Sequence, residues 1–266
     1  MDLGLEGRTA AVTGGSMGIG KAVARGLAAE GVNVAILARG QEALDAVVAD
    51  LSGLPGEIVA VQTDLTDRKS VDAAAAAVAE RFGTVHILVN NAGHRMRSME
   101  RQIHWEDEDW EADINVKTLG MLRAIRAFHP HLVKDGSGSI INISGIAAAI
   151  VFHGALTHGI NNSAMQTTTK YLAKDMATEN IRVNAIAPGL VATEWRHGWA
   201  QMMADNQDIT KQEFLDRYTA QIGAFIGRWA EVAEVADVAT FLASDRAAYI
   251  TGTVIDVDGG ITANAR

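Results

Sequence analysis

Cysteine is absent from the sequence, and this absence alone removes several kinds of chemistry. The chain cannot form a disulfide, a thiolate metal site or a thiol nucleophile, and its composition is compatible with a reducing compartment. Proline is scarce, with three residues in the whole chain, and no stretch rich in proline, serine or charge marks a linker. We therefore expect one folding unit, and we predict no metal site.

Long apolar runs and an excess of basic residues are missing as well. No run approaches the roughly 18 apolar residues of a membrane-spanning helix, and the first residues lack the charged and then apolar pattern of a secretion signal. Lysine and arginine number 23 against 32 aspartates and glutamates, which gives a net charge of −9. Nucleic acids and anionic membranes bind basic surfaces, so we expect neither as a partner. The sequence instead favours a cytoplasmic protein with a small-molecule substrate.

The pattern that is present is an alternation of short β-rich runs with longer, alanine-rich stretches of helical spacing. With 266 residues, 48% of them hydrophobic, the chain can build one large α/β domain over residues 1–266. Several of the β-rich runs are apolar throughout, as strands covered on both faces are. The alternation predicts a doubly wound Rossmann fold, a parallel seven-stranded sheet with helices on both faces. The seven predicted strands are 8–13, 32–38, 57–62, 85–90, 139–144, 181–187 and 253–257.

Residues 194–226 interrupt this rhythm near the end of the chain. They carry many large side chains without a strand pattern: Trp195, Trp199, Met202, Met203, Phe214, Tyr218 and Phe225. We interpret the segment as an insertion that forms a helical lid over the substrate site. A surface helix pair buried in a contact between subunits fits the same pattern, and the sequence does not decide between the two.

A glycine-rich turn follows the first predicted strand and opens a helix predicted over 21–30. The turn reads Thr13-Gly14-Gly15-Ser16-Met17-Gly18-Ile19-Gly20. Gly14 permits the tight turn, Gly18 lets the backbone approach a pyrophosphate, and Gly20 lets the helix pack closely. The first amides of the helix then face the anion. The turn therefore predicts a dinucleotide site whose contacts include Gly14, Ser16, Met17, Gly18 and Ile19.

The glycine spacing, TGxxxGxG, resembles that of the short-chain dehydrogenase/reductase family, and further motifs extend the resemblance over essentially the whole chain. Asn90-Asn91-Ala92-Gly93 resembles the family's NNAG motif, which lines the cofactor cleft. By the same resemblance, Asp64-Leu65 would contact the adenine, and the carbonyl of Asn115 would hold a water of the proton relay. The segments that would lie beside the nicotinamide are Pro188-Gly189, Val191 and Thr193, and those that would take part in subunit packing are 241–244, 251–252 and 256–260. The resemblance implies an NAD(P)-dependent oxidoreductase that acts on a carbonyl or alcohol, as a homotetramer or homodimer.

The second predicted strand ends at Ala38-Arg39, where an NAD-binding protein usually places a carboxylate for the ribose hydroxyls. The guanidinium of Arg39 could pair with a 2′-phosphate instead. The resemblance to the family implies the same, since an arginine at this position is similar to the pattern of members that prefer NADP. The alternative is a solvated arginine at a strand end. We expect NADP as the cofactor, with NAD possible.

The Tyr-x-x-x-Lys pair that family enzymes use is missing. The residues four positions after Tyr171, Tyr218 and Tyr249 are Asp175, Ile222 and Thr253. Counting back from Arg182-Val183-Asn184, which resembles the family's RVN strand, places His158 and Asn162 at the expected positions. The two residues lie one helical turn apart and so share a face.

Histidine titrates near pH 6.5 without help, so His158 could exchange a proton without a lysine, while Asn162 could donate to ribose hydroxyls. We predict His158, Ser144, Asn115 and Asn162 as the catalytic set. The family's serine falls on Gly145, with Ser144 beside it; a one-residue difference in the following loop would leave Ser144 as the oxyanion donor.

Three hypotheses of function follow. The leading one is an NADP-dependent reductase or dehydrogenase with His158 as the acid/base. The others are non-redox chemistry on the same fold, of the lyase or dehydratase kind, and a non-catalytic dinucleotide-binding protein. The substrate is indicated only by its possible contacts. An apolar or ring-containing substrate would suit four tryptophans, which could equally serve in packing: Trp105, Trp110, Trp195 and Trp199. Further candidates for polar contacts with the substrate are His94, Arg95, Arg97, His153 and Thr157.

Overall fold

The computed structural model describes residues 2–93, 102–134 and 136–264 and contains one parallel seven-stranded sheet in the order β3-β2-β1-β4-β5-β6-β7. The predicted fold class is confirmed, and every predicted strand is present with its ends shifted by at most two residues. The strands are β1 (Thr9–Thr13), β2 (Asn33–Ala38), β3 (Ile58–Gln62), β4 (Ile87–Asn90), β5 (Gly138–Ile143), β6 (Ile181–Pro188) and β7 (Val254–Val257).

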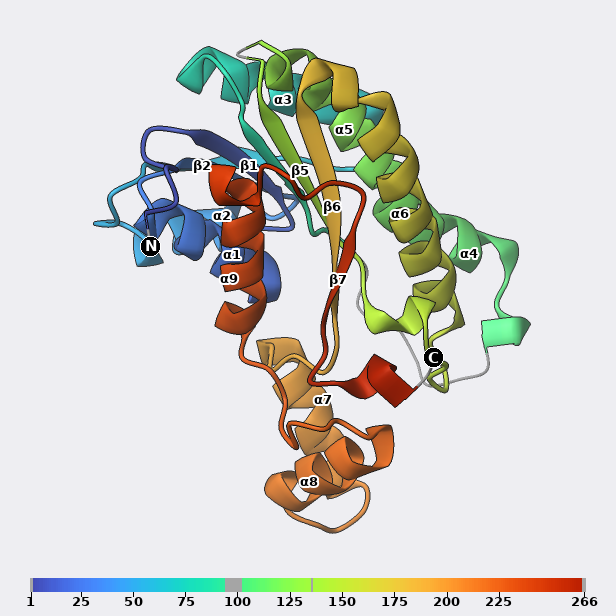
Figure 1. Ribbon diagram of the computed structural model, residues 1–266. Helices are drawn as coiled ribbons and strands as arrows, with labels where there is room; N and C mark the ends of the chain where they lie inside the picture. Colours follow the sequence, from blue (N-terminus) through green and yellow to red (C-terminus); the bar gives the residue numbers. More distant parts are fainter. Residues whose placement is uncertain (1, 94–101, 135, 265–266) are drawn as a thin grey trace.

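Helices cover both faces of the sheet (Figure 1). They are α1 (Gly18–Ala29), α2 (Gln41–Asp50), α3 (Arg68–Phe82), α4 (Asp107–Ile114), α5 (Gly120–Leu132), α6 (Leu156–Asp175), α7 (Glu194–Asp205), α8 (Lys211–Ile222) and α9 (Val232–Ala243). A π-helical segment, Asn115–Leu119, joins α4 to α5. No helix within the described ranges is long and apolar enough to cross a membrane.

The sheet is buried on both faces because its strands carry apolar side chains at consecutive positions. Val12 of β1 packs into one core with α1, α2 and α9, while its neighbour Ala11 belongs to a second core with α3, α5 and α6. Successive side chains of a strand point to opposite faces, so an alternating pattern could not have filled both cores.

The strand order reverses between β1 and β4, which are hydrogen-bonded neighbours although two strands separate them along the chain. In open α/β sheets, ligands bind outside the carboxyl ends of the strands at such a switch point. The glycine turn follows β1 and the NNAG-like motif follows β4, so both lie at this point.

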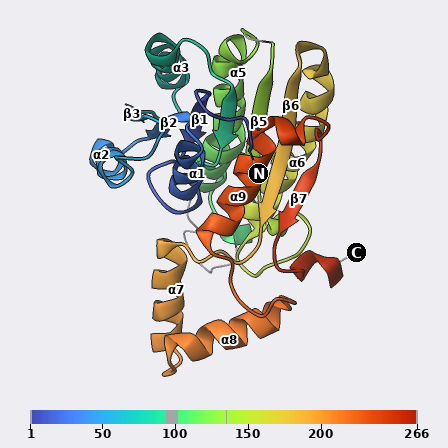
Figure 2. The same cartoon turned by 60° about the vertical axis from the view of Figure 1, so that its left-hand side comes forward.

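The segment 194–226 is helical, as predicted. Its helices α7 and α8 lie beyond the carboxyl end of β6 in both views (Figures 1 and 2). They form a third apolar cluster, in which Trp199 packs edge-on against Phe214 with ring centroids 5.4 Å apart and stacks on Trp229. A backbone bridge between Val191 and Ala230 closes the segment at its base. Whether it acts as a lid or as a subunit contact stays a prediction.

Candidate active site

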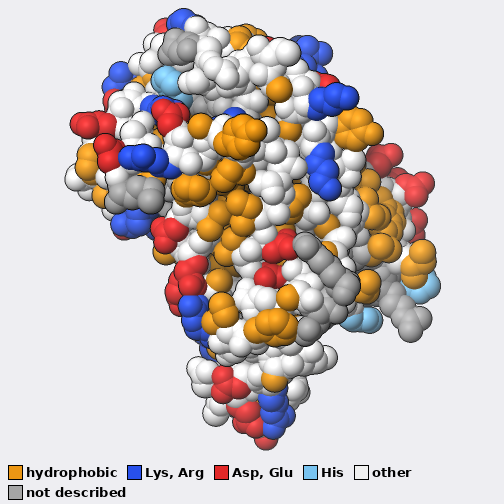
Figure 3. Space-filling view, viewed as in Figure 1, with side chains coloured by type: hydrophobic (Ala, Val, Ile, Leu, Met, Phe, Trp, Pro, Cys, Tyr) orange, Lys and Arg blue, Asp and Glu red, His pale blue; other side chains and the backbone are white. Residues whose placement is uncertain are grey.

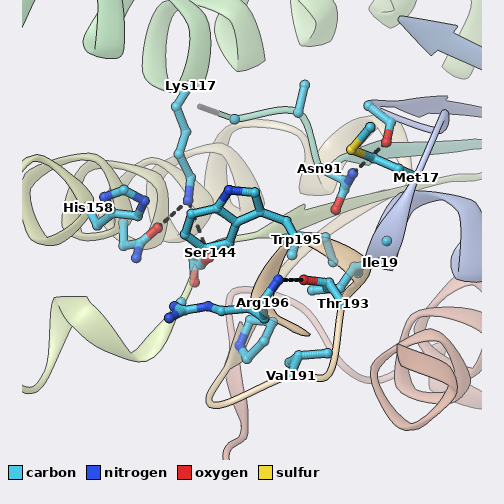
Figure 4. Close-up of a pocket in the computed structure, with 18 of the residues that line it drawn as sticks. Met17, Ile19, Asn91, Lys117, Ser144, His158, Val191, Thr193, Trp195 and Arg196 are labelled. Carbon is cyan, nitrogen blue, oxygen red and sulfur yellow. Dashed lines mark hydrogen bonds between the residues drawn. The ribbon is translucent and has the colours of Figure 1, made fainter. Parts of the chain in front are cut away.

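A cavity of about 1300 Å³ opens at the carboxyl ends of the strands, between the glycine turn and α7. All the residues predicted to bind the cofactor line it, and so do His158 and Ser144 of the predicted catalytic set (Figure 4). Residues from the ends of six strands, β1 to β6, and from several helices therefore meet at one place, as the motif positions predict. Among the described residues, no group of three or more histidines, aspartates and glutamates is arranged to hold a metal ion.

The glycine turn is shaped for close approach of a ligand to the backbone. Gly14 has φ +66° and Gly18 φ +52°, and a Cβ on Gly20 would lie 2.2 Å from the carbonyl oxygen of Gly14. The helix α1 begins at Gly18, earlier than the predicted start at 21. This early start places the first amides of the helix in the turn itself. These amides carry a partial positive charge, which attracts an anion. The turn thus fits a pyrophosphate.

The NNAG-like motif is hydrogen-bonded to the glycine turn. The Asn91 side chain donates to the carbonyl oxygens of Thr13 (3.1 Å) and Gly14 (3.0 Å), and the Asn91 and Ala92 amides donate to the Thr13 hydroxyl. A Cβ on Gly14 would lie 2.9 Å from the Ala92 Cα, so the two segments are in direct contact. These bonds hold the ends of β1 and β4 in a fixed relation on the cavity wall.

Opposite charges meet at the end of the cavity predicted to bind adenosine. Burial raises the pKa of Asp64, but hydrogen bonds from Thr66 and the charges of Arg39 and Arg123 outweigh it and hold this pKa below its ordinary value. Arg39 is exposed on the rim, and its side chain forms no ion pair within 4 Å in the described part of the chain. An exposed guanidinium at this position fits a 2′-phosphate.

His158 and Asn162 lie on α6 and line the same cavity, as their spacing predicts (Figure 4). Asn162 is buried, and its Oδ1 accepts a hydrogen bond of 2.6 Å from the ammonium of Lys117. Its Nδ2 points toward Gly145, where an added Cβ would lie only 2.8 Å away. Gly145 therefore leaves the space that the Asn162 amide occupies.

Ser144 is held by groups of the fold. Its hydroxyl donates to the Ile186 carbonyl oxygen of β6 (3.0 Å) and accepts from the Gln166 side chain (3.3 Å). A side chain at position 145 would point toward Asn162, whereas that of Ser144 points back toward β6. To act as an oxyanion donor, Ser144 would have to exchange its bond to Ile186; its assignment stays a prediction.

Asn115 lies at the start of the π-helical segment and is bound by Arg123. The guanidinium donates to the Asn115 carbonyl oxygen (3.0 Å) and to its Oδ1 (2.7 Å). The two following residues, Val116 and Lys117, line the cavity, while Asn115 itself does not. The predicted water-holding carbonyl is thus already an acceptor for Arg123, and the relay role of Asn115 stays a prediction.

Lys117 is a site residue that the sequence patterns did not indicate. Besides Asn162, its ammonium contacts the Ser144 carbonyl oxygen at 3.4 Å (Figure 4). Burial lowers the pKa of Lys117 to about 8, although the charge of the nearby Asp113 opposes this shift. The only sequence signal is its place two residues after Asn115. On a regular α-helix those positions face different directions, so the signal was too weak to use.

Comparisons with known proteins agree with this geometry. A family model described as Enoyl-(Acyl carrier protein) reductase matches residues 14–262. The 3-oxoacyl-(acyl-carrier-protein) reductase of Thermotoga maritima is 34% identical over 257 residues, which cover 97% of this chain and 98% of that protein. L-Sorbose reductase from Gluconobacter frateurii, whose crystal structure holds NADPH and L-sorbose, has a TM-score of 0.93 at 31% identity and covers 98% of this chain and 99% of its own. The actinorhodin polyketide ketoreductase, crystallised with NADPH as a single-residue variant, has a TM-score of 0.86 at 30% identity, and the match covers 96% of this chain and 97% of that one.

The chain belongs to the short-chain dehydrogenase/reductase family. The resemblance noted in the sequence is thereby confirmed, and with it the expectation of an NAD(P)-dependent oxidoreductase that acts on a carbonyl or alcohol group. The assignment of Gly145, His158 and Asn162 to the positions of the family's usual serine, tyrosine and lysine stays a prediction from the sequence.

The α7 end of the cavity carries an aromatic ring and a cation. Trp195 and Arg196 both line the cavity, and the guanidinium of Arg196 lies 5.5 Å from the ring centroids of Trp195 and Trp199 (Figure 4). Burial lowers the pKa of Arg196, and the proximity of Tyr218 opposes this. A cation stacked on indole rings is held in place without a carboxylate.

The other tryptophans considered from the sequence have packing roles. Trp199 is buried in the third apolar cluster, and Trp105 and Trp110 contact each other edge-to-face, 5.8 Å between centroids. His153 lines the cavity. Thr157 is buried and exchanges hydrogen bonds with the Gln102 side chain. His94, Arg95 and Arg97 lie outside the described residues.

Proposed function

We propose that this protein is an NADP-dependent carbonyl reductase or alcohol dehydrogenase in which His158 exchanges the proton of the substrate oxygen. The observation that carries the proposal is that His158 lines the same cavity as the glycine turn and the NNAG-like motif. The NADPH found in L-sorbose reductase and in the polyketide ketoreductase supports NADP as the cofactor of this chain.

The residues around the cavity fit this cofactor along its length. The turn at Gly14 and Gly18 would hold the pyrophosphate through backbone amides, and Arg39 the 2′-phosphate. Asp64 and Leu65 would contact the adenine. The nicotinamide end would be lined by Asn91, Ala92, Gly93, Pro188, Gly189, Val191 and Thr193. When bound, NADPH supplies a hydride to the carbonyl carbon of the substrate.

His158 would give the carbonyl oxygen its proton as the carbon is reduced, and would take up a replacement proton from solvent. In the reverse direction the same side chain would accept the proton of the alcohol. Asn162 would orient the cofactor sugar from the adjacent helical turn of α6. Trp195, on the first turn of α7, would cover the reacting groups and exclude water, which makes residues 194–226 a lid.

The substrate is a small carbonyl compound or alcohol, and we propose an apolar or ring-containing one because the Trp195 indole points into the cavity (Figure 4). We also propose a homotetramer or homodimer. Figure 3 shows apolar side chains gathered on the face over α9, where Val238 and Phe241 are partly exposed. Apolar patches of this kind mark subunit contacts.

A single substitution tests the role of His158. In His158→Ala, kcat for NADPH-dependent reduction of cyclic ketones should fall by about 10²-fold or more, the usual contribution of a general acid. The Kd for NADPH should stay within about threefold, because His158 is assigned to the substrate oxygen. His131→Ala, on α5 and away from the cavity, is the matched control and should behave as the wild type. Undiminished turnover in His158→Ala would remove His158 from the mechanism.

A further inference from the structure

The cavity wall next to Asn162 carries an ammonium group that comes from a different part of the chain. Lys117 belongs to the π-helical segment between α4 and α5, whereas Asn162 lies on α6. The Lys117 Nζ lies 2.6 Å from the Asn162 Oδ1 and 3.4 Å from the Ser144 carbonyl oxygen. We propose that Lys117 is the cation of the nicotinamide site, which binds the cofactor sugar where a short-chain dehydrogenase/reductase would use a lysine on α6.

The course of the side chain places Lys117 beside the cofactor cleft. A Cβ on Gly93, the last residue of the NNAG-like motif, would lie 3.4 Å from the Lys117 Cδ. The stem of Lys117 therefore lies against Gly93, and its ammonium reaches Asn162. An ammonium has three N–H groups. Two have acceptors among the described residues, which leaves the third for an oxygen of a bound ligand.

Lys117 fits physically with two of the residues that differ from the usual family pattern, Asn162 and Gly145. A lysine at 162 would bring a second ammonium to the place where Nζ of Lys117 now lies, and two like charges there would repel each other. Asn162 instead presents a neutral oxygen to Lys117. A Cβ at position 145 would crowd the Nδ2 of Asn162, so Gly145 leaves room for this arrangement. Lys117, Asn162 and Gly145 thus form one structural set.

The charged and titratable groups on the neighbouring elements set the state of Lys117. Asp113 on α4 is buried and favours the ammonium, while burial itself favours the neutral amine, and the pKa of about 8 reflects both. His158 on α6 and Arg196 on α7 line the same cavity, and Arg123 on α5 is bound to Asn115. At neutral pH the group is therefore mostly charged and able to donate to sugar hydroxyls.

Cofactor binding without turnover is the first test. Lys117→Met should weaken the binding of NADPH, measured by fluorescence titration, by about 10-fold to 100-fold, because a hydrogen bond from a charged donor is lost. Lys117→Arg should recover part of this affinity. Lys170→Met is the matched control, since Lys170 is exposed on α6, and it should bind NADPH as the wild type does. A Lys117→Met variant that binds NADPH with wild-type affinity would overturn the proposal.

A second test exploits the absence of cysteine from the chain. In Lys117→Cys the introduced thiol is unique, and 2-bromoethylamine converts it to an S-aminoethyl group of lysine length, while iodoacetamide adds a neutral group of similar bulk. Aminoethylation should restore NADPH affinity at least several-fold over the unmodified thiol, and iodoacetamide should not. Equal recovery with both reagents would mean that Lys117 only fills space. This comparison holds even if Lys117→Met does not fold.

The inference rests on the proposed function only for its kinetic arm. If Lys117 acts in turnover as a cation, kcat should fall as the pH rises through its pKa. The amine of the aminoethyl group has a lower pKa than lysine because sulfur withdraws electrons, so this fall in kcat should occur at lower pH in the modified protein. If the fall in kcat stays at the same pH after modification, Lys117 takes no part in turnover. If no carbonyl compound oxidises NADPH, the proposed function fails, while the two binding comparisons still decide whether Lys117 holds the cofactor.

Discussion

Removing the ammonium of Lys117 should change how the stability of the protein depends on pH. The pKa of Lys117 is about 8 in the folded protein and 10.5 in the unfolded chain. Between these values the unfolded state binds more protons, so the free energy of unfolding of the wild type must rise with pH through this group. Below about pH 8 the charged, buried ammonium makes the fold less stable than a neutral amine would.

The magnitude follows from the two pKa values. From about pH 7 to about pH 9.5 the linkage relation gives a gain of about 2 kcal/mol for the wild type relative to Lys117→Met, which cannot titrate there. Lys117 is only partly buried, so we expect about 1 to 2 kcal/mol after screening by solvent.

Urea unfolding of both proteins, measured at steps of pH over this range, provides the assay. The difference in unfolding free energy between wild type and Lys117→Met should climb steadily with pH, whereas the difference between wild type and Lys170→Met should stay flat. A difference for Lys117→Met that is flat or falls with pH would refute the reasoning, because it would mean that the folded environment does not lower the pKa of Lys117.

Two further substitutions test the cofactor preference and the packing of the altered site. Arg39→Asp should weaken the binding of NADPH by about 10-fold to 100-fold and leave that of NADH equal or better, because a carboxylate repels a 2′-phosphate and accepts from ribose hydroxyls; fluorescence titration with both cofactors decides it, and an unchanged ratio of affinities would show that Arg39 is only a solvated side chain. Gly145→Ser should lower the unfolding free energy by about 1 to 3 kcal/mol, since its Cβ would lie 2.8 Å from the Asn162 Nδ2. When Asn162→Ala is combined with Gly145→Ser, the double variant should regain most of this lost stability, as measured by thermal melts. If the destabilising effects of the two substitutions simply add, the proposed crowding is contradicted.

Much of the fold was predictable because local patterns and tertiary structure agree. The apolar runs at β1 and β4 are buried on both faces, which is the arrangement that such runs favour. In the turn, Gly14 and Gly18 adopt the left-handed backbone that their positions require. The start of α1 was misplaced by three residues, since the turn closes directly into the helix at Gly18 without a break.

The site was only partly predictable, for geometric reasons. His158 and Asn162 could be placed because both lie on α6 at a spacing of one turn. Lys117 could not, because its contact with Asn162 joins residues 45 positions apart through a π-helical segment that no sequence signal marks. The partner of the Ser144 hydroxyl, Ile186, likewise depends on the pairing of β5 with β6.

The most direct test of the central claim follows the reacting atom itself. NADPH carrying deuterium at both hydrogen positions of the nicotinamide C4 is mixed with a cyclic ketone and the protein, and the product is examined by mass spectrometry. The wild type should give an alcohol with deuterium on the former carbonyl carbon, and His158→Ala should give very little of it in the same time. Consumption of the ketone without transfer of deuterium would contradict the account, because the chemistry at His158 would then not be a reduction.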